Sequence, residues 1–308
     1  MKVYTRSKTL SLFAALAILF IVIAPQARAG FSLGAGADFA VLVEPDLHNF
    51  NLTSDSGITG NVGIGSPINA VMLSSGTITG NLDFSGAAPS GGPGYGGTVT
   101  GTEMTSDSTV TSALGTVNSL SSTLGAESGT ALTISGGGQT INATSGTLDG
   151  SGNYVFTVSA SHFNPGGGSG GITINGTASQ YVVINVDNGT SNESINGAIN
   201  LTGGITADHV LFNFVGTGGE LGGAANDKIA NGVFLAPDMK VNLNSVTIDG
   251  RIFGGGSTTS NNDFQIVSNA YVNAPGNSQV PEPASILLLG TVLAVTGTLL
   301  RRRLSSDS

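Results

Sequence analysis

The chain of 308 residues contains no cysteine. Disulfides, thiolate nucleophiles and cysteine-ligated metal sites are therefore excluded, and stability must come from packing and hydrogen bonds. Charged residues are also scarce, because only 9% of the chain is Asp, Glu, Lys or Arg, whereas 39% is hydrophobic. Disordered chains combine low hydrophobicity with high charge density, so this composition predicts a folded body despite its 48 glycines.

Basic residues are nearly absent from the middle of the chain. Between residues 30 and 280, three basic residues (Lys228, Lys240 and Arg251) stand against seventeen acidic ones, which gives a formal charge of −14. Phosphate binding needs concentrated Lys and Arg. The sequence therefore predicts that neither nucleic acid nor an anionic membrane surface is a partner of this body.

The N-terminus has the three parts of a secretory signal peptide. Basic residues within the first eight positions precede an uncharged apolar run at residues 10–24, and Ala27-Arg28-Ala29 follows. Small residues at Ala27 and Ala29 are what a signal peptidase recognises. We predict that residues 1–29 are a signal peptide, cleaved after Ala29, and that the protein is exported. An uncleaved N-terminal membrane anchor is the alternative.

A second apolar run, at residues 284–300, carries no charge and leads directly into Arg301, Arg302 and Arg303. Its length is at the lower limit for crossing a bilayer. An arginine at the centre of a span costs about 2.5 to 3.5 kcal/mol, and positive charge is retained on the cytoplasmic side. We predict a transmembrane helix at 284–300 and a cytoplasmic basic tail at 301–308, with the body on the export side. A buried core helix is the alternative.

Pro281, Glu282 and Pro283 stand immediately before that helix, in a linker at residues 276–283. The two prolines keep the segment extended and outside the helix, which leaves its backbone accessible at the membrane face. Pro-Glu-Pro, an apolar helix and a terminal Arg cluster resemble the PEP-CTERM sorting signal. The resemblance implies recognition by an exosortase, a membrane-embedded cysteine transpeptidase. That enzyme removes the helix and passes the protein from the inner membrane to the cell surface or extracellular matrix.

Short alternating segments bounded by Gly, Asn or Asp recur through the body, residues 30–275. Each predicts a strand that ends in a turn. Many such strands in succession predict a mainly β, β-solenoid-like fold whose coils bury an apolar face against one another. A β-sandwich is the alternative on the same spacing. We expect strands at residues 57–65, 76–84, 153–159, 171–175, 181–186, 198–202, 209–215, 232–236, 240–243, 246–253 and 264–272.

One segment has a helical pattern instead. After Asp107, apolar residues recur at three- and four-residue spacing, which predicts a single lateral amphipathic helix that ends near Gly125. Its other positions are mostly Ser, Thr and Asn, which are poor helix formers, so packing against the β body must hold it in place. The apolar positions are Val110, Ala113, Leu114, Val117, Leu120 and Leu124.

The order of these elements carries a second resemblance. Its best segments are Val210-Leu-Phe-Asn-Phe214, Gly232-Val-Phe-Leu-Ala-Pro237 and Ile248-Asp-Gly-Arg-Ile-Phe253. The body resembles the choice-of-anchor A family of bacterial surface domains. The bacterial ice-binding β-solenoids, which share the strands, one lateral helix and a returning strand set, are the nearest competing family. Neither resemblance implies a catalytic residue.

No group of catalytic residues stands out. Asp208 and His209 are adjacent in a predicted strand, and neighbouring strand residues point to opposite faces, so we expect a surface pair there. No carboxylate pair can be singled out. The sequence predicts a non-enzymatic protein. A polysaccharide-active enzyme stays as an alternative, because a fold alone does not exclude the glycan chemistry that β-solenoids often host.

Calcium is left open as a ligand, although we predict no cofactor. Asp149-Gly-Ser-Gly-Asn153 and Asp187-Asn-Gly-Thr190 place oxygen donors on tight turns of an acidic exported protein. Asp and Asn are also ordinary turn formers, and no twelve-residue calcium loop that ends in Glu is present.

Ice is the other ligand left open. Thr77-Ile-Thr79, Thr98-Val-Thr100 and Thr100-Gly-Thr102 offer threonines for a flat face, but we expect them to cluster near a loop rather than repeat along a sheet. The sequence favours a structural or adhesive protein in the exopolysaccharide layer of a Gram-negative bacterium. An ice-binding protein is the alternative.

Overall fold

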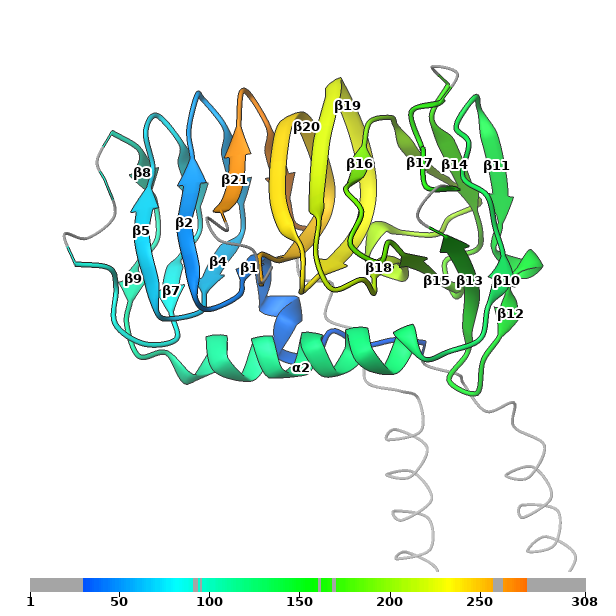
Figure 1. Ribbon diagram of the computed structural model, residues 1–308, viewed down its shortest axis with the longest axis horizontal. Coiled ribbons are helices and arrows are strands. Elements are labelled where there is room, and N and C mark those ends of the chain that lie inside the picture. Colours follow the sequence, from blue (N-terminus) through cyan, green and yellow to red (C-terminus); the bar gives the residue numbers. More distant parts are fainter. Residues whose placement is uncertain are drawn as a thin grey trace, which may run out of the picture.

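The computed structural model describes residues 30–275, apart from 91–93, 95, 160–161, 168–169 and 257–262. Nearly all strand pairs in this part of the chain are parallel and belong to one continuous sheet. Figure 1 shows the strands as coils stacked side by side, with one long helix along the stack. The predicted mainly β, solenoid-like body with one lateral helix is confirmed. The parallel ladders exclude the β-sandwich, which is built from antiparallel sheets.

The predicted signal peptide, linker, transmembrane helix and basic tail all lie outside the described residues. Within the residues that are described, no helix is both long and apolar enough to cross a bilayer.

The first part of the chain builds one half of the stack. Its strands recur in groups of three, so that β1, β4, β7 and β9 follow one side of the coils while β3, β6 and β8 follow another. These strands are β1 (Phe39–Val43), β2 (Leu47–Leu52), β3 (Gly57–Thr59), β4 (Asn61–Ile64), β5 (Ile68–Met72), β6 (Thr77–Thr79), β7 (Leu82–Phe84), β8 (Thr98–Val99) and β9 (Glu103–Met104).

The helix α2 (Ser108–Gly125) then runs along the outside, and the second half of the stack is built back toward the first (Figure 1). The last long strands, β19 and β20, each bend through all three sides of a coil. The second half holds β10 (Thr130–Ala131), β11 (Gln139–Asn142), β12 (Thr147–Leu148), β13 (Asn153–Ser159), β14 (Ile172–Asn175), β15 (Tyr181–Asp187), β16 (Glu193–Ile195), β17 (Ile199–Thr202), β18 (Val210–Phe214), β19 (Glu220–Ala236), β20 (Lys240–Gly254), β21 (Asp263–Val267) and β22 (Tyr271–Asn273).

The two halves meet at a seam, by which we mean the contacts of β1, β2 and β3 with β20, β21 and β22. Each side of the first coil pairs in parallel with the corresponding side of the last coil. The sheet is thereby continuous across segments about two hundred residues apart in sequence. Register partners across the seam are Val41 with Ile252, Phe50 with Phe264, and Ile58 with Val272.

The corners of the first coils repeat one pair of residues, a glycine followed by an asparagine. Gly60 and Gly80 turn the chain with positive φ angles of 122° and 157°, and each is followed by an asparagine. The Oδ1 atom of Asn61 accepts a hydrogen bond from the backbone N–H of Asn81 at 3.0 Å, and Asn81 accepts from Thr102 in the same way at 3.0 Å. Each asparagine therefore satisfies a backbone donor of the next coil.

The predicted helix is confirmed, including its end at Gly125. The side chain of Asp107 caps it by accepting from the N–H of Thr109 at 2.8 Å, which satisfies one of the unpaired donors of the first turn. Its apolar stripe packs on outward-facing residues of the solenoid. The buried stripe comprises Val110, Ala113, Leu114, Val117 and Leu124, and its partners include Leu42, Leu211, Val233, Leu235 and Phe253.

A buried polar network fixes the C-terminal half of the helix on the solenoid. Asn213 on β18 donates to the backbone oxygen of Ser121 at 2.9 Å and to Oδ1 of Asn185 at 2.9 Å. It also accepts from the Ser121 hydroxyl at 2.6 Å, and Asn185 donates to the backbone oxygen of Leu124 at 2.7 Å. All of these polar groups are paired, so the network adds geometric specificity to the apolar contact.

Several strand predictions are wrong in their boundaries. Residues 57–65 and 76–84 each form two strands, β3 with β4 and β6 with β7, and residues 232–236 are only the end of β19. Residues 240–243 and 246–253 form one strand, β20, whereas residues 264–272 form two, β21 and β22. Ser245 has a φ of +51° within β20, and Ser268 and Asn269 have φ of +57° and +61° between β21 and β22. Alternation of apolar residues does not show whether such a corner bends a strand or divides it.

We predict that Asn213→Ala lowers the free energy of unfolding by about 2 to 4 kcal/mol, because it removes three hydrogen bonds and leaves Ser121 and Asn185 with unpaired buried groups. Urea denaturation of the body measures the change. The matched control is Asn200→Ala, which truncates an exposed asparagine with one long hydrogen bond of 3.4 Å. Equal losses in the two variants would show that the buried network does not stabilise the fold.

Candidate functional site

A row of outward-facing polar side chains crosses both halves of the stack. Strand register places one such side chain on each successive strand along one side of the coils, and all of them are exposed or half-buried. We call these nine residues the polar row. It consists of Thr140, Thr173, Asn200, Asn231, Asp249, Asn273, Thr59, Thr79 and Thr100.

One end of the polar row is rich in threonine. Thr77 and Thr98 are register partners on β6 and β8, beside Thr59, Thr79 and Thr100 of the row. Five exposed hydroxyl-bearing side chains therefore lie on three adjacent strands and the residue that follows the last of them. The expectation that these threonines do not repeat along a sheet is wrong. A loop lies between the two Thr-x-Thr segments in the sequence, so the sequence did not show that they are one full coil apart and pair with each other.

The centre of this surface is mixed in chemistry. Asn273 donates to Oδ1 of Asp249 at 3.1 Å, which pairs an amide with a carboxylate in the middle of the row. Tyr271 and Ile229, on the adjoining register positions, are 37% and 46% exposed. Neighbouring strands lie about 4.8 Å apart, so the surface presents hydrogen-bonding groups at regular intervals beside apolar contact area. Such a surface suits an extended, repetitive ligand better than a small substrate.

Asp208 and His209 do not form the predicted surface pair on a strand. They belong to the short 3-10 helix η5 (Ala207–His209). The His209 ring stacks on Tyr181 with ring centroids 3.9 Å apart, and burial lowers the pKa of His209 below its usual value. Asp208 accepts from Nε of Arg251 at 3.3 Å. Asp208 is therefore engaged by Arg251, and the His209 ring by Tyr181.

Arg251 is the buried cation of the seam. Its side chain is 3% exposed, and Nη1 donates to the backbone oxygen of Phe39, where β1 begins, at 2.7 Å. Nη2 donates to the backbone oxygen of Pro275 at 3.5 Å. Together with the Asp208 contact, this side chain joins η5, the start of the first coil and the end of the last. Its role is structural.

The first calcium candidate is an internal turn. Oδ1 of Asp149 accepts from the backbone N–H groups of Ser151, Gly152 and Asn153 at 2.6 to 2.8 Å, and Oδ2 accepts from the Asn153 amide at 2.7 Å. The Asn153 Oδ1 atom accepts in turn from the N–H of Phe31 at 2.7 Å. The oxygens that calcium would need are used to fix the first residues of the body.

In the second calcium candidate, the side chain of Asn188 forms hydrogen bonds that hold a corner of the coil. Asn188 accepts from the N–H of Gly216 at 2.9 Å and donates to the backbone oxygen of Gly218 at 3.0 Å. Across the described residues, no group of three or more acidic, His or Cys side chains is arranged to hold a metal ion.

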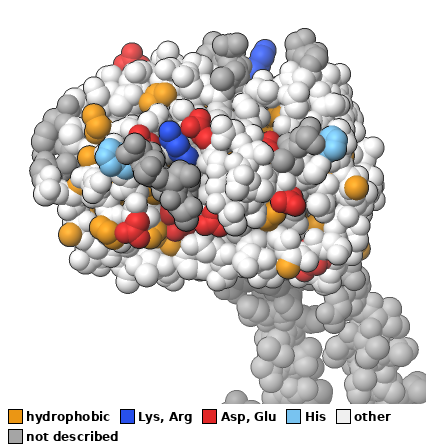
Figure 2. Space-filling model, in the orientation of Figure 1, with side chains coloured by type: hydrophobic (Ala, Val, Ile, Leu, Met, Phe, Trp, Pro, Cys, Tyr) orange, Lys and Arg blue, Asp and Glu red, His pale blue; other side chains and the backbone are white. Residues whose placement is uncertain are grey.

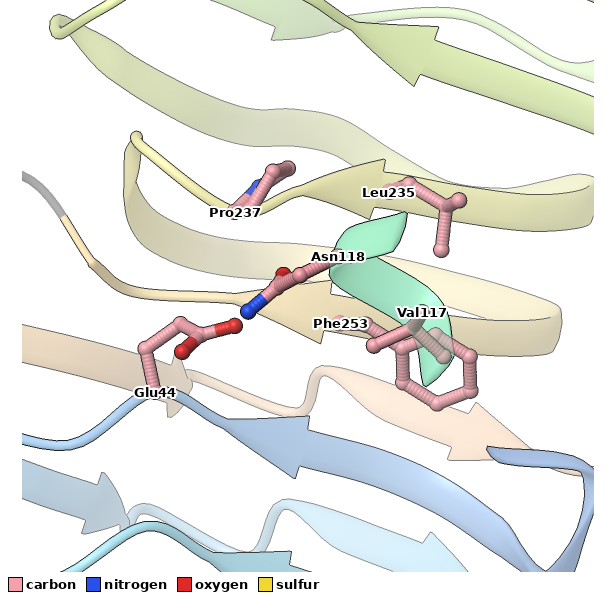
Figure 3. Close-up of a pocket in the computed structure, with 6 residues that line it drawn as sticks. All are labelled: Glu44, Val117, Asn118, Leu235, Pro237 and Phe253. Carbon is pink, nitrogen blue, oxygen red and sulfur yellow. The ribbon is translucent and has the colours of Figure 1, made fainter. Parts of the chain in front are cut away.

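A crevice between α2 and the solenoid holds a carboxyl with unusual titration (Figure 3). Glu44, just after β1, faces Asn118 of the helix, with Leu235 and Phe253 among the apolar neighbours. The crevice has no room for a water-sized molecule, so it is a packing contact and not a ligand site. Burial raises the pKa of Glu44 to about 7; the hydrogen bond with Asn118 opposes the shift and the charge of Asp238 adds to it.

The sorting and processing residues predicted from the sequence lie outside the described part of the chain. They are Ala27, Ala29, Pro281, Glu282, Pro283, Arg301, Arg302 and Arg303. Within the body, sequence reasoning did not find Glu44, Asn118, Asn185 or Asn213. A spacing signal existed only for the first coils, where Thr-Gly-Asn recurs after twenty residues, at Thr59 and Thr79.

Two family models match this chain. The model of an ice-binding-like adhesive domain matches residues 28–266, and the PEP-CTERM protein-sorting motif matches residues 279–303. No curated protein matches the sequence.

Solved ice-binding proteins share the fold. One from an Arctic yeast is 18% identical with a TM-score of 0.54, over 84% of this chain and 98% of its own. One from an Antarctic biological consortium is 17% identical with a TM-score of 0.51, over 81% and 91%. One from an Antarctic bacterium of the Flavobacteriaceae is 14% identical with a TM-score of 0.52, over 84% and 52%. At these identities the likeness shows the fold alone.

The titration of Glu44 predicts a pH-dependent stability. Its pKa is about 7 in the folded body against 4.5 for the ordinary group, so folding favours the protonated form. The contribution is fully present below about pH 4.5 and is lost as the pH rises through 7. We expect it to be on the order of 1 to 3 kcal/mol, because each pKa unit corresponds to about 1.4 kcal/mol and part of the shift is screened.

Urea denaturation of the wild type and of Glu44→Gln between pH 5 and pH 8 measures this contribution. The wild type should lose more stability than the variant as the pH rises, because the neutral amide cannot ionise. Burial also raises the pKa of Glu193 to about 7. Because Glu193 is present in both proteins, the difference between them reports Glu44. The exposed Glu127→Gln should follow the wild type. Parallel curves for the wild type and Glu44→Gln would contradict the assignment.

Proposed function

The chain belongs to the family of ice-binding-like adhesive domains, and from this premise we propose that it is an adhesive or structural component of an exopolysaccharide layer. The family and the sorting motif together make it an exported, non-enzymatic protein associated with the cell surface. The motif implies processing by an exosortase. The proposal adds the matrix as the destination and the polysaccharide as the ligand.

The polar row is the observation that carries this proposal. It offers amide, hydroxyl and carboxylate groups from eight strands, and from Thr100 directly after β8, on one rigid surface. Each contact with a sugar hydroxyl is weak, but a polymer that follows the row makes many of them at once, and linked contacts raise the overall affinity. A repetitive chain is thus the ligand class that this surface favours.

The route to the surface follows from the terminal segments. In this proposal, signal peptidase cleaves after Ala29, and the helix at 284–300 holds the protein in the inner membrane with Arg301 to Arg303 inside. The exosortase then acts at the Pro-Glu-Pro segment and releases the body to the matrix. The matched sorting motif, residues 279–303, supports this order of events.

Ice binding is a second candidate, favoured by the five exposed threonines on β3, β6 and β8 and directly after β8. The mixed centre of the surface argues against it, because Asp249 and Tyr271 interrupt any uniform array of hydroxyls. The matched families give no support to the alternative of a polysaccharide-active enzyme.

We predict that Thr79→Tyr weakens retention of exopolysaccharide several-fold, because a bulky ring in the polar row prevents a polymer from lying flat. Co-sedimentation of the mature protein with exopolysaccharide from the bacterium that encodes it gives the measurement. The matched control, Thr123→Tyr, places the same ring on the exposed side of α2 and should bind like the wild type. Ice-crystal shaping by the wild type that Thr79→Tyr abolishes, without any polysaccharide binding, would favour the second candidate instead.

We predict that Glu282→Ala leaves full-length protein in the membrane. The change alters the recognition segment without touching the apolar span, and the N-terminal signal still directs export. Intact mass and immunoblots of membrane and medium fractions, in cells with a working exosortase, report the processing. Glu127→Ala, a matched charge removal on the body, should be processed normally. Release of the Glu282 variant at the wild-type rate would make Pro-Glu-Pro a simple linker.

A further inference from the structure

A second surface feature lies on another side of the coils, over β16, β19 and β20. It is a depression of about 300 Å³, which we call the notch, lined by Asn192, Ser194, Glu220, Gly222, Asn242 and Asn244. These strands are neighbours in the sheet and lie side by side in the middle of the stack in Figure 1. In the matching view of Figure 2 the surface consists mainly of uncharged polar side chains and backbone. The notch is therefore a polar hollow within a polar surface.

The notch exists because one side chain is missing. Strand register places Gly222 between Ser194 on one neighbouring strand and Asn242 on the other. With strands about 4.8 Å apart, this leaves a gap of roughly 10 Å between the flanking side chains. A Cβ atom at Gly222 would meet nothing closer than 3.7 Å. Neither crowding nor backbone conformation thus requires glycine here, and its effect is to open space.

The side chains around the notch are held in place. Asn242 donates to Oε1 of Glu220 at 3.2 Å, and Lys240 pairs with Oε2 at 3.4 Å. The backbone N–H of Glu220 donates to Oδ1 of Asn192 at 2.9 Å. The carboxylate is thus oriented, and its charge is balanced by Lys240. Hydroxyl and amide groups of Ser194 and Asn244 add both donors and acceptors.

Glu193 also lines the notch. It is 4% exposed, and its buried Oε1 atom has no hydrogen-bond partner within the described part of the chain. Its register partner is the fully buried Leu221, whereas the neighbouring pair of Ser194 and Gly222 faces the notch, so the Glu193 side chain lies on the inner face of the strand and is not offered to a ligand in the notch.

We propose that the notch is a saccharide-binding site that accommodates one or two neutral sugar rings of a polysaccharide chain. Its volume is at the lower end of the range for ligand pockets, about 300 to 1,000 Å³. Sugar hydroxyls both donate and accept, which matches a set of amides, a hydroxyl and a balanced carboxylate. The inference rests on the proposed function and names a specific site for it, distinct from the polar row.

The test fills the notch. Gly222→Leu places a side chain into the open space without a steric clash, so the fold and its thermal midpoint should be unchanged. Binding of neutral oligosaccharides, prepared by partial acid hydrolysis of the exopolysaccharide, should weaken at least tenfold. Saturation-transfer NMR and calorimetry on the mature protein provide the measurements. The matched control is Gly115→Leu, at a helix position where an added Cβ has nothing within 4 Å.

A second variant keeps the test decisive if Gly222→Leu unfolds. Glu220→Gln preserves the shape of the side chain but removes its charge, and it should weaken oligosaccharide binding several-fold. Unchanged binding in a folded Gly222→Leu, or in Glu220→Gln if the former does not fold, would overturn the notch while the proposed function stands. A wild-type protein that binds neither the polysaccharide nor its fragments would overturn both.

Discussion

The parallel pairing of β1 with β4 on one side and β20 on the other is the contact on which the rest of the body depends. A stack of parallel coils has two open ends, and strands at an open end present unpaired backbone groups. Here the first and last coils meet inside the stack, so these chain segments are fully paired. Arg251 reinforces the seam by joining the start of β1 to the end of the body. The consequence is that neither half can be displaced without breaking a continuous sheet.

The helix follows from this topology. After the first half has grown away from the seam, the chain must return along the stack before the second half can grow back. The eighteen residues of α2 cover about 27 Å at 1.5 Å per residue. Intrinsic propensity contributes little to such a Ser- and Thr-rich helix, so tertiary contacts must fix it: an apolar stripe, the crevice at Glu44 and the network of Asn185 and Asn213.

The sequence was sufficient for the helix and for most strands because each has a local signal, such as the cap at Asp107 or the alternation that predicted β13 over residues 153–159. No local feature of the sequence indicated which strands pair with one another. Register partners are 28 residues apart between β13 and β15, where Asn153 faces Tyr181, but 18 apart between β19 and β20, where Val233 faces Arg251. The loops and corners between strands differ in length from coil to coil, and this changes the spacing of register partners. No fixed repeat length therefore shows which side chains lie in the same row. The polar row and the notch both depend on that register.

The same register explains why fold likeness does not transfer a ligand. Inward residues such as Ile248 must fill the core and can be matched by any apolar side chain of similar size, so distant relatives keep the coil. The flanking Thr247 and Asp249 face outward, where packing imposes little. The threonine-rich end, the Asp249–Asn273 pair and the open space at Gly222 all lie at outward positions, so the shared fold does not require them in a relative. The strands β19 and β20 contribute to both the polar row and the notch, so one rigid pair of strands presents both surfaces at a fixed spacing. A polymer that is long enough to turn one corner of the coil can therefore contact both surfaces at once.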